Sequence, residues 1–183
     1  MQTIRTVFLI LTALLVGCNS TRTPENLAMY PKQITPYPLG SISKIHAFEG
    51  VLLAGQPTPE DFVLAKEEGI ATVINIRHPD EIGFDEEQVV EDLGMTYHNL
   101  AWGSPSELTD DVLDSYRELL RTEKRPILFH CGSSNRVGAI WMAYRALDDG
   151  IGLESALSES ITVGLRTQAY KVKVCDYVAY NLD

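Results

Sequence analysis

A cysteine and an arginine stand five positions apart in the second half of the chain, and their spacing suits covalent chemistry on an oxyanion. Cys131 is followed by four small or polar residues and then by Arg136. A run of small residues lets successive backbone N–H groups converge on one anion. A cysteine beside such a nest is favoured as the thiolate, which is the nucleophilic form. The arginine adds a planar fork of donors that suits a tetrahedral oxyanion.

The residues around this pair predict a loop between a strand and a helix. The apolar run 126–129 predicts a short strand, and a helix is expected from Val137 to about Leu147. The N-terminus of a helix adds partial positive charge to the loop before it. Four loop residues are therefore predicted to bind the anion: Gly132, Ser133, Ser134 and Asn135. The alternative is a buried cysteine beside a glycine turn, with the arginine in an ordinary salt bridge.

The run His130-Cys131, Arg136-Val137-Gly138 resembles the signature of protein tyrosine and dual-specificity phosphatases. The resemblance covers most of residues 50–150 and implies the cysteine-phosphatase fold. It implies that Cys131 is the nucleophile, that Arg136 clamps the phosphate, and that His130 orients the loop and helps to keep the cysteine ionised. The substrate would then be a phosphorylated protein of the phosphotyrosine type or a small phosphate ester, and no cofactor or metal is implied.

Two further segments, 53–58 and 72–77, resemble a bacterial subgroup found in beta-lactamase-hydrolase-like proteins and in phosphatase–NAD kinase fusions. The loop departs from the common pattern because it has four residues between cysteine and arginine, where most members have five. Val137 also stands where many members have a serine or threonine that assists release of the thiolate.

The general acid is the third departure. Phosphatases of this class usually place an aspartate on the loop after the strand preceding the nucleophile strand, but Gly103 and Ser104 occupy that place here. Glu107 and Asp110 lie just beyond and are the candidate general acids. Asp110 follows the helix cap Thr109, so complementing the helix dipole is the competing explanation for its charge.

Two other functions remain open on the sequence. The six-residue loop from Cys131 to Arg136 matches the loop length of rhodaneses, so a sulfurtransferase that carries sulfur as a Cys131 persulfide is one alternative. The absence of a clear general acid leaves a second, a non-catalytic lipoprotein that binds phosphoanions. His130 and the Arg-Val-Gly continuation favour the phosphatase.

The elements that must position this loop alternate between strands and helices. Strands are expected at 42–48, 51–53, 71–76, 95–101 and 126–129, and helices at 58–69, 85–93, 137–147, 153–161 and 167–180. A further helix is expected to start at the cap Thr109 and to reach at least Leu120. Alternation of this kind predicts an α/β fold with a central, mostly parallel sheet flanked by helices. The catalytic domain is expected to span residues 42–183.

The charge of the chain and its remaining histidines and cysteines limit the ligands that it is expected to bind. The net charge of −10 over 183 residues disfavours binding to nucleic acid, because an acidic surface repels the phosphate backbone. His46, His78 and His98 have no cysteine or carboxylate at metal-ligand spacing, so no metal site is expected. Cys175 is interpreted as a small buried hydrophobe, with a disulfide to Cys131 as the alternative.

The N-terminus predicts export. The apolar run 7–16 is too short to span a bilayer, which takes about 20 residues, and is typical of a secretory signal. Leu15-Val16-Gly17-Cys18 resembles a bacterial lipobox, which implies a signal peptide at 1–17 and lipid on Cys18. Residues 18–41 are predicted to tether the domain to the membrane. Asn19 favours the outer membrane, with the enzyme facing the periplasm.

Overall fold

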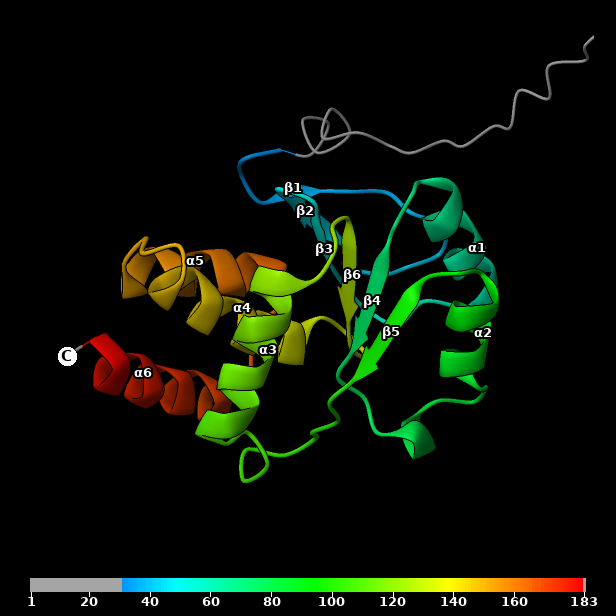
Figure 1. Cartoon of the computed structure of the whole chain (residues 1–183). Helices are drawn as coiled ribbons and strands as arrows, with labels where there is room; N and C mark the ends of the chain where they lie inside the picture. The colour runs from blue at the N-terminus through cyan, green and yellow to red at the C-terminus, as the bar shows by residue number, and fades with distance from the viewer. Residues whose placement is uncertain (1–30, 183) are drawn as a thin grey trace, which may run out of the picture.

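The centre of the protein is a six-stranded sheet, seen in a computed structural model that describes residues 31–182 (Figure 1). The strands are β1 (Thr35–Pro36), β2 (His46–Phe48), β3 (Val51–Ala54), β4 (Thr72–Asn75), β5 (Thr96–Asn99) and β6 (Ile127–His130). Their order in the sheet is β1-β2-β3-β6-β4-β5. The four strands from β3 to β5 are parallel, and β1 and β2 pair antiparallel at one edge. The predicted fold class is confirmed.

Helices cover both faces of this sheet. One face carries α1 (Pro59–Glu67) and α2 (Glu86–Asp92), and the other carries α3 (Asp110–Thr122), α4 (Asn135–Leu147), α5 (Leu153–Val163) and α6 (Gln168–Leu182) (Figure 1). A short 3-10 helix, η2 (Pro79–Glu81), follows β4. Within the described residues, no helix is both long enough and apolar enough to cross a membrane.

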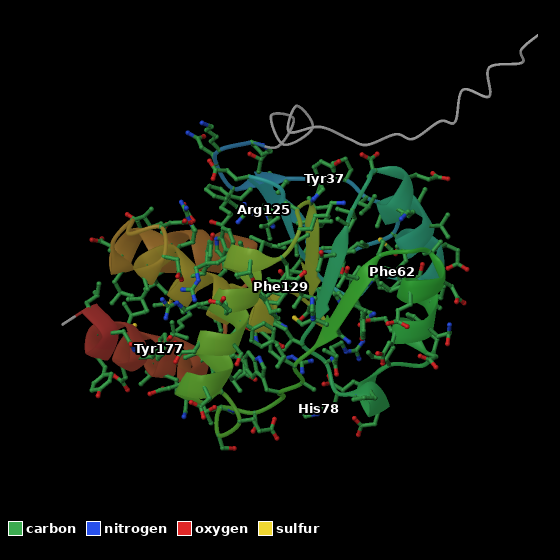
Figure 2. The ribbon with its side chains drawn as sticks, in the orientation of Figure 1. Tyr37, Phe62, His78, Arg125, Phe129 and Tyr177 are labelled. Atoms are coloured by element: carbon green, nitrogen blue, oxygen red, sulfur yellow. The ribbon has the colours of Figure 1, made fainter. Side chains whose placement is uncertain are left out.

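The two layers of helices give two apolar cores. Phe129 belongs to the core under α3 to α6, and Phe62 to the core under α1 and α2, so the two rings lie on opposite sides of the sheet (Figure 2). All four residues of β6 are buried. A central parallel strand is covered on both faces, which explains why its sequence is a continuous apolar run.

Local signals in the sequence account for the starts of α1, α2 and α3. Thr58 accepts a hydrogen bond from the backbone of Asp61, whose side chain binds the backbone of Thr58 in return, forming a capping box. Asp85 caps α2 by accepting the backbone N–H of Gln88, and Thr109 caps α3 by accepting that of Val112. The strand expected over 42–48 is shorter, because its pairing begins only at His46.

Ordered structure begins before the expected domain boundary at Ile42. Residues 31–41 contain β1, which pairs with β2, and Leu39, which is buried in the core beside α1. This part of the predicted tether therefore belongs to the folded unit. Cys18 and the signal peptide lie outside the described residues.

Candidate active site

The carboxyl ends of the parallel strands open into a cavity of about 570 Å³. Its walls combine the loop after β6 with the loops after β4 and β5 and one residue of α6: His78, Asp80, Glu81, Gly103, Ser104, Glu107, Cys131, Gly132, Ser133, Asn135, Arg136 and Tyr170. Ligands of open α/β sheets bind at this edge, because the loops that follow neighbouring strands meet there. The cavity is therefore the candidate active site.

Cys131 lies at the floor of the cavity, directly after the central strand β6. Its thiol is 1% exposed yet lines the cavity, and it is free of disulfides, as is the half-buried Cys175. Gly132, Ser133 and Asn135 line the cavity beside it, and Ser134 is fully buried behind them. Three of the four residues predicted to bind the anion therefore line the cavity, and Ser134 does not.

The backbone of this loop turns sharply at Ser134, whose φ of 61° lies in the left-handed region. The turn leads directly into α4, which begins at Asn135. The first N–H groups of a helix have no carbonyl in a preceding turn, so they are available to an anion held in the loop. The strand, turn and helix therefore form an anion nest with a thiol at its mouth.

Arg136 presents one edge of its guanidinium to the protein and leaves the other edge free. Nη1 donates to Glu81 Oε1 at 2.8 Å and to the Trp102 carbonyl at 2.7 Å, and Nη2 donates to Glu81 Oε2 at 2.6 Å. A guanidinium has five N–H donors. No hydrogen bond from Nε is found among residues 31–182, so Nε and the second hydrogen of Nη2 remain for an oxyanion.

The charge of Arg136 is affected by Glu81 and by Cys131. Burial opposes the charge of the guanidinium, but the hydrogen bonds to Glu81 and the proximity of Cys131 outweigh burial and raise the pKa of Arg136. The hydrogen bond from Arg136 in turn lowers the pKa of Glu81 to about 2, against the opposing effect of burial. Glu81 is therefore a permanent carboxylate that fixes the orientation of the arginine.

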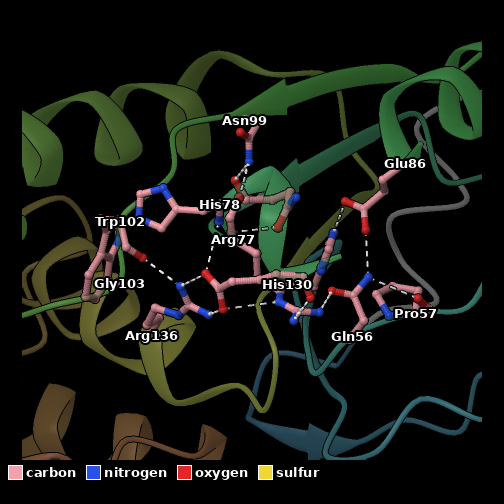
Figure 3. Close-up of polar contacts among 12 residues, drawn as sticks. Gln56, Pro57, Arg77, His78, Glu86, Asn99, Trp102, Gly103, His130 and Arg136 are labelled. Atoms are coloured by element: carbon pink, nitrogen blue, oxygen red, sulfur yellow. Dashed lines mark hydrogen bonds and ion pairs between the residues drawn. The ribbon is translucent and has the colours of Figure 1, made fainter. Parts of the chain in front are cut away.

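A chain of polar contacts runs from this pair to the buried side of the loop (Figure 3). Arg77 binds the Glu81 carbonyl and donates through Nη1 to Gln56 Oε1 at 2.6 Å. Gln56 Nε2 donates to Glu86 Oε2 at 2.6 Å, and the other Glu86 oxygen lies 3.0 Å from His130 Nε2. The network supports the loop from both ends, beside Arg136 and beneath Cys131.

The two candidate general acids occupy different places. Asp110 begins α3, is exposed, and is absent from the cavity lining. Glu107 does line the cavity, but its carboxylate accepts the backbone N–H groups of Gly103 and Ser104. Those two hydrogen bonds, together with His78, lower the pKa of Glu107. Glu107 therefore stays ionised and is poorly suited to donate a proton.

His78 lines the cavity beside Gly103, where phosphatases of this class would be expected to have an aspartate as general acid. Its Nε2 lies 3.4 Å from Glu107 Oε2, and its ring packs over Gly103, where an added Cβ would lie 3.4 Å from the ring. His78, from the loop after β4, therefore lies beside Gly103, at the position where the general acid was expected. Tyr170 of α6 secures Gly103 by donating to its carbonyl at 2.9 Å.

Four polar residues of this arrangement were not predicted as site residues: Gln56, His78, Glu81 and Glu86. Glu81 and Glu86 stand in the first turns of short helices, where acids are expected for the helix dipole alone. Only Gln56 and His78 gave a usable signal, because they follow the ends of the parallel strands β3 and β4 by two and three residues, at the edge where sites form.

Comparison with known proteins shows the fold. No protein-family model and no curated protein sequence matches the chain. Among solved structures, Pseudomonas aeruginosa TpbA in complex with pTyr is 16% identical, with 84% of this chain and 98% of that chain covered and a TM-score of 0.65. A candidate phosphatase of the DUF442 class from Shewanella putrefaciens is 18% identical, with 87% and 99% covered and a TM-score of 0.61.

A third similar structure is a candidate phosphatase from Neisseria meningitidis, 19% identical, with 70% of this chain and 93% of that chain covered and a TM-score of 0.58. The likeness to all three runs through nearly the whole of each solved chain. The protein therefore has a phosphatase-like α/β fold.

Proposed function

We propose that the protein is a cysteine-dependent phosphatase that hydrolyses phosphate monoesters through a thiophosphate intermediate. The observation that carries the proposal is that one cavity is lined both by Cys131 and by Arg136, whose guanidinium has one edge free. A nucleophile and a fixed fork for the anion it attacks are the two parts that this chemistry needs.

The reaction has two displacements at phosphorus. The Cys131 thiolate attacks, the S–P bond forms as the P–O bond to the leaving group breaks, and the loop amides and Arg136 stabilise the equatorial oxygens. Water then attacks phosphorus, the S–P bond breaks, and phosphate leaves with the thiolate restored. His130, paired with Glu86, orients the loop and favours the ionised cysteine.

We assign proton transfer to His78. The charged imidazole gives a ring proton to the leaving oxygen in the first displacement and takes a proton from water in the second. Glu107, which remains ionised, stabilises the charged ring from 3.4 Å. This assignment replaces the direct role considered for Glu107 and Asp110.

The substrates in view are phosphotyrosine-type proteins and small phosphate esters. TpbA was solved with pTyr, and PTPMT1, another solved structure of similar fold, was solved with PI(5)P, which supports a phosphate-ester substrate for a chain of this fold.

The lipobox at Leu15–Cys18 supports a lipid anchor on Cys18 and a place in the bacterial cell envelope, on the periplasmic face of the outer membrane. Mass spectrometry of the mature N-terminus tests the anchor, with Cys18→Ser as the control.

The decisive experiment compares two activities in the full chain purified in detergent. Hydrolysis of p-nitrophenyl phosphate is expected, with complete loss in Cys131→Ser and no loss in the matched control Cys175→Ser. Transfer of sulfur from thiosulfate to cyanide without phosphatase turnover would establish the rhodanese-like function instead. If neither activity is found while phosphate still binds, the protein is a binding module.

A further inference from the structure

The turn between α5 and α6 is packed directly on the nucleophile loop. An added Cβ at Gly138 of α4 would lie 2.9 Å from both the backbone nitrogen of Leu165 and the carbonyl oxygen of Ser160. At Gly164, an added Cβ would lie 3.2 Å from Ser134. These close approaches need glycine, and they leave the turn little freedom to move away from the loop.

Asn135 of the loop fixes the same turn by hydrogen bonds. Its Oδ1 accepts the backbone N–H groups of Arg166 at 2.8 Å and Thr167 at 3.2 Å, and its Nδ2 donates to Thr167 Oγ1 at 2.9 Å. A residue of the candidate anion site therefore determines where the Arg166 backbone lies.

The side chain of Arg166 reaches the rim of the site and meets no acid there. Nη2 donates to Ser133 Oγ at 2.7 Å, and Nη1 makes long contacts of 3.5 and 3.4 Å with the carbonyls of Ser133 and Gly164. The other described arginines are bound to carboxylates, except Arg125, which binds backbone carbonyls and Tyr144. Arg166 is exposed and keeps its charge available.

We propose that Arg166 and Ser133 form a second anion subsite, which selects small phosphate esters that carry a second phosphate group. This inference rests on the proposed function and specifies its substrate class. The scissile phosphate would lie in the loop against Arg136, and the second phosphate would bind the Arg166 guanidinium at the rim. Because Ser133 belongs to both sites, the two phosphates must be close, as in one small molecule.

Binding of inorganic anions tests the subsite without requiring turnover. The full chain carrying Cys131→Ser is titrated calorimetrically with phosphate, pyrophosphate and tripolyphosphate. We expect pyrophosphate or tripolyphosphate, whichever fits the subsite better, to bind at least about tenfold more tightly than phosphate, because a charge-assisted bidentate contact is a strong one. Adding Arg166→Gln should remove this gain and leave the affinity for phosphate unchanged.

The matched control is Lys173→Gln, which removes one exposed positive charge from α6. It should leave the gain intact. Persistence of the gain in Arg166→Gln, or an equal loss of affinity for phosphate and for the longer anions, would overturn the subsite while leaving the phosphatase proposal standing. Failure of phosphate itself to bind the Cys131→Ser chain with Arg166 intact would overturn the proposed function and the subsite together.

Discussion

Glu86 Oε1 lies 3.0 Å from His130 Nε2, and both side chains are buried beneath the nucleophile loop. Burial opposes ionisation of Glu86, but His130 and the hydrogen bonds from Gln56 and Tyr97 outweigh it and lower the pKa of Glu86. Glu86 is therefore a buried carboxylate in contact with the residue next to Cys131. We expect this contact to hold His130 in place and, through it, the loop that favours the Cys131 thiolate.

Replacing Glu86 with glutamine should therefore weaken both the fold and the nucleophile. Gln56 and Tyr97 would lose a charged hydrogen-bond acceptor, and hydrogen bonds to charged groups contribute about 1.5–3 kcal/mol to the free energy of unfolding. Alkylation of Cys131 by iodoacetamide near neutral pH should become slower, because less of the thiol is ionised. Urea unfolding and the alkylation rate measure the two effects. Glu87→Gln, an exposed neighbour, should change neither; equal behaviour of the two variants would refute the role of Glu86.

Acid should destabilise the protein through the same carboxylates. The folded-state pKa is lowered for Glu86 and is about 2 for Glu81, whereas the ordinary value is 4.5. Below about pH 4.5 the unfolded chain binds more protons than the folded chain, so stability falls as pH falls through the folded-state values. Above that range the full contribution is present.

The midpoint of urea unfolding, followed from about pH 7 to about pH 3, should be constant near neutral pH and should fall at the acid end of this range. The drop should be smaller in Glu86→Gln, which has lost one of the titrating groups. An identical acid drop in that variant would show that other groups are responsible.

His78 as proton donor predicts a dependence on the leaving group. His78→Gln should lower kcat/KM for phenyl phosphate by about 10²–10⁴-fold, the usual contribution of general acid catalysis. The loss should be much smaller for p-nitrophenyl phosphate, because nitrophenolate leaves without being protonated. Asp80 also lines the cavity, so Asp80→Asn is the comparison variant. A selective loss in Asp80→Asn, with none in His78→Gln, would move the role to the aspartate.

Gly138→Ala should destabilise the protein by about 1–3 kcal/mol, because the new methyl group meets backbone atoms that cannot move aside easily. The atoms are the nitrogen of Leu165 and the carbonyl oxygen of Ser160. Gly83 has nothing within 4 Å of an added Cβ, so Gly83→Ala is the control and should be nearly neutral. Thermal unfolding measures both. A neutral result at Gly138 would mean that α4 and the α5–α6 turn can separate at little cost.

The sequence by itself determined the fold class and the centre of the site. Continuous apolar runs such as 127–129 predict buried strands, and caps such as Thr58 and Thr109 mark helix starts, because these signals depend only on neighbours along the chain. The loop from Cys131 to Arg136 is equally local, so a candidate nucleophile and a candidate anion-binding arginine could be predicted from residue types and spacing.

Only the tertiary structure decided what surrounds that loop. Glu81 reaches Arg136 across 55 positions of the chain, and Arg166 reaches Ser133 across 33. Such contacts depend on the order of strands in the sheet and on the packing of α4 against the α5–α6 turn, which no local pattern encodes. For the same reason the sequence directed attention to Glu107 and Asp110, whereas the fold places His78 over Gly103.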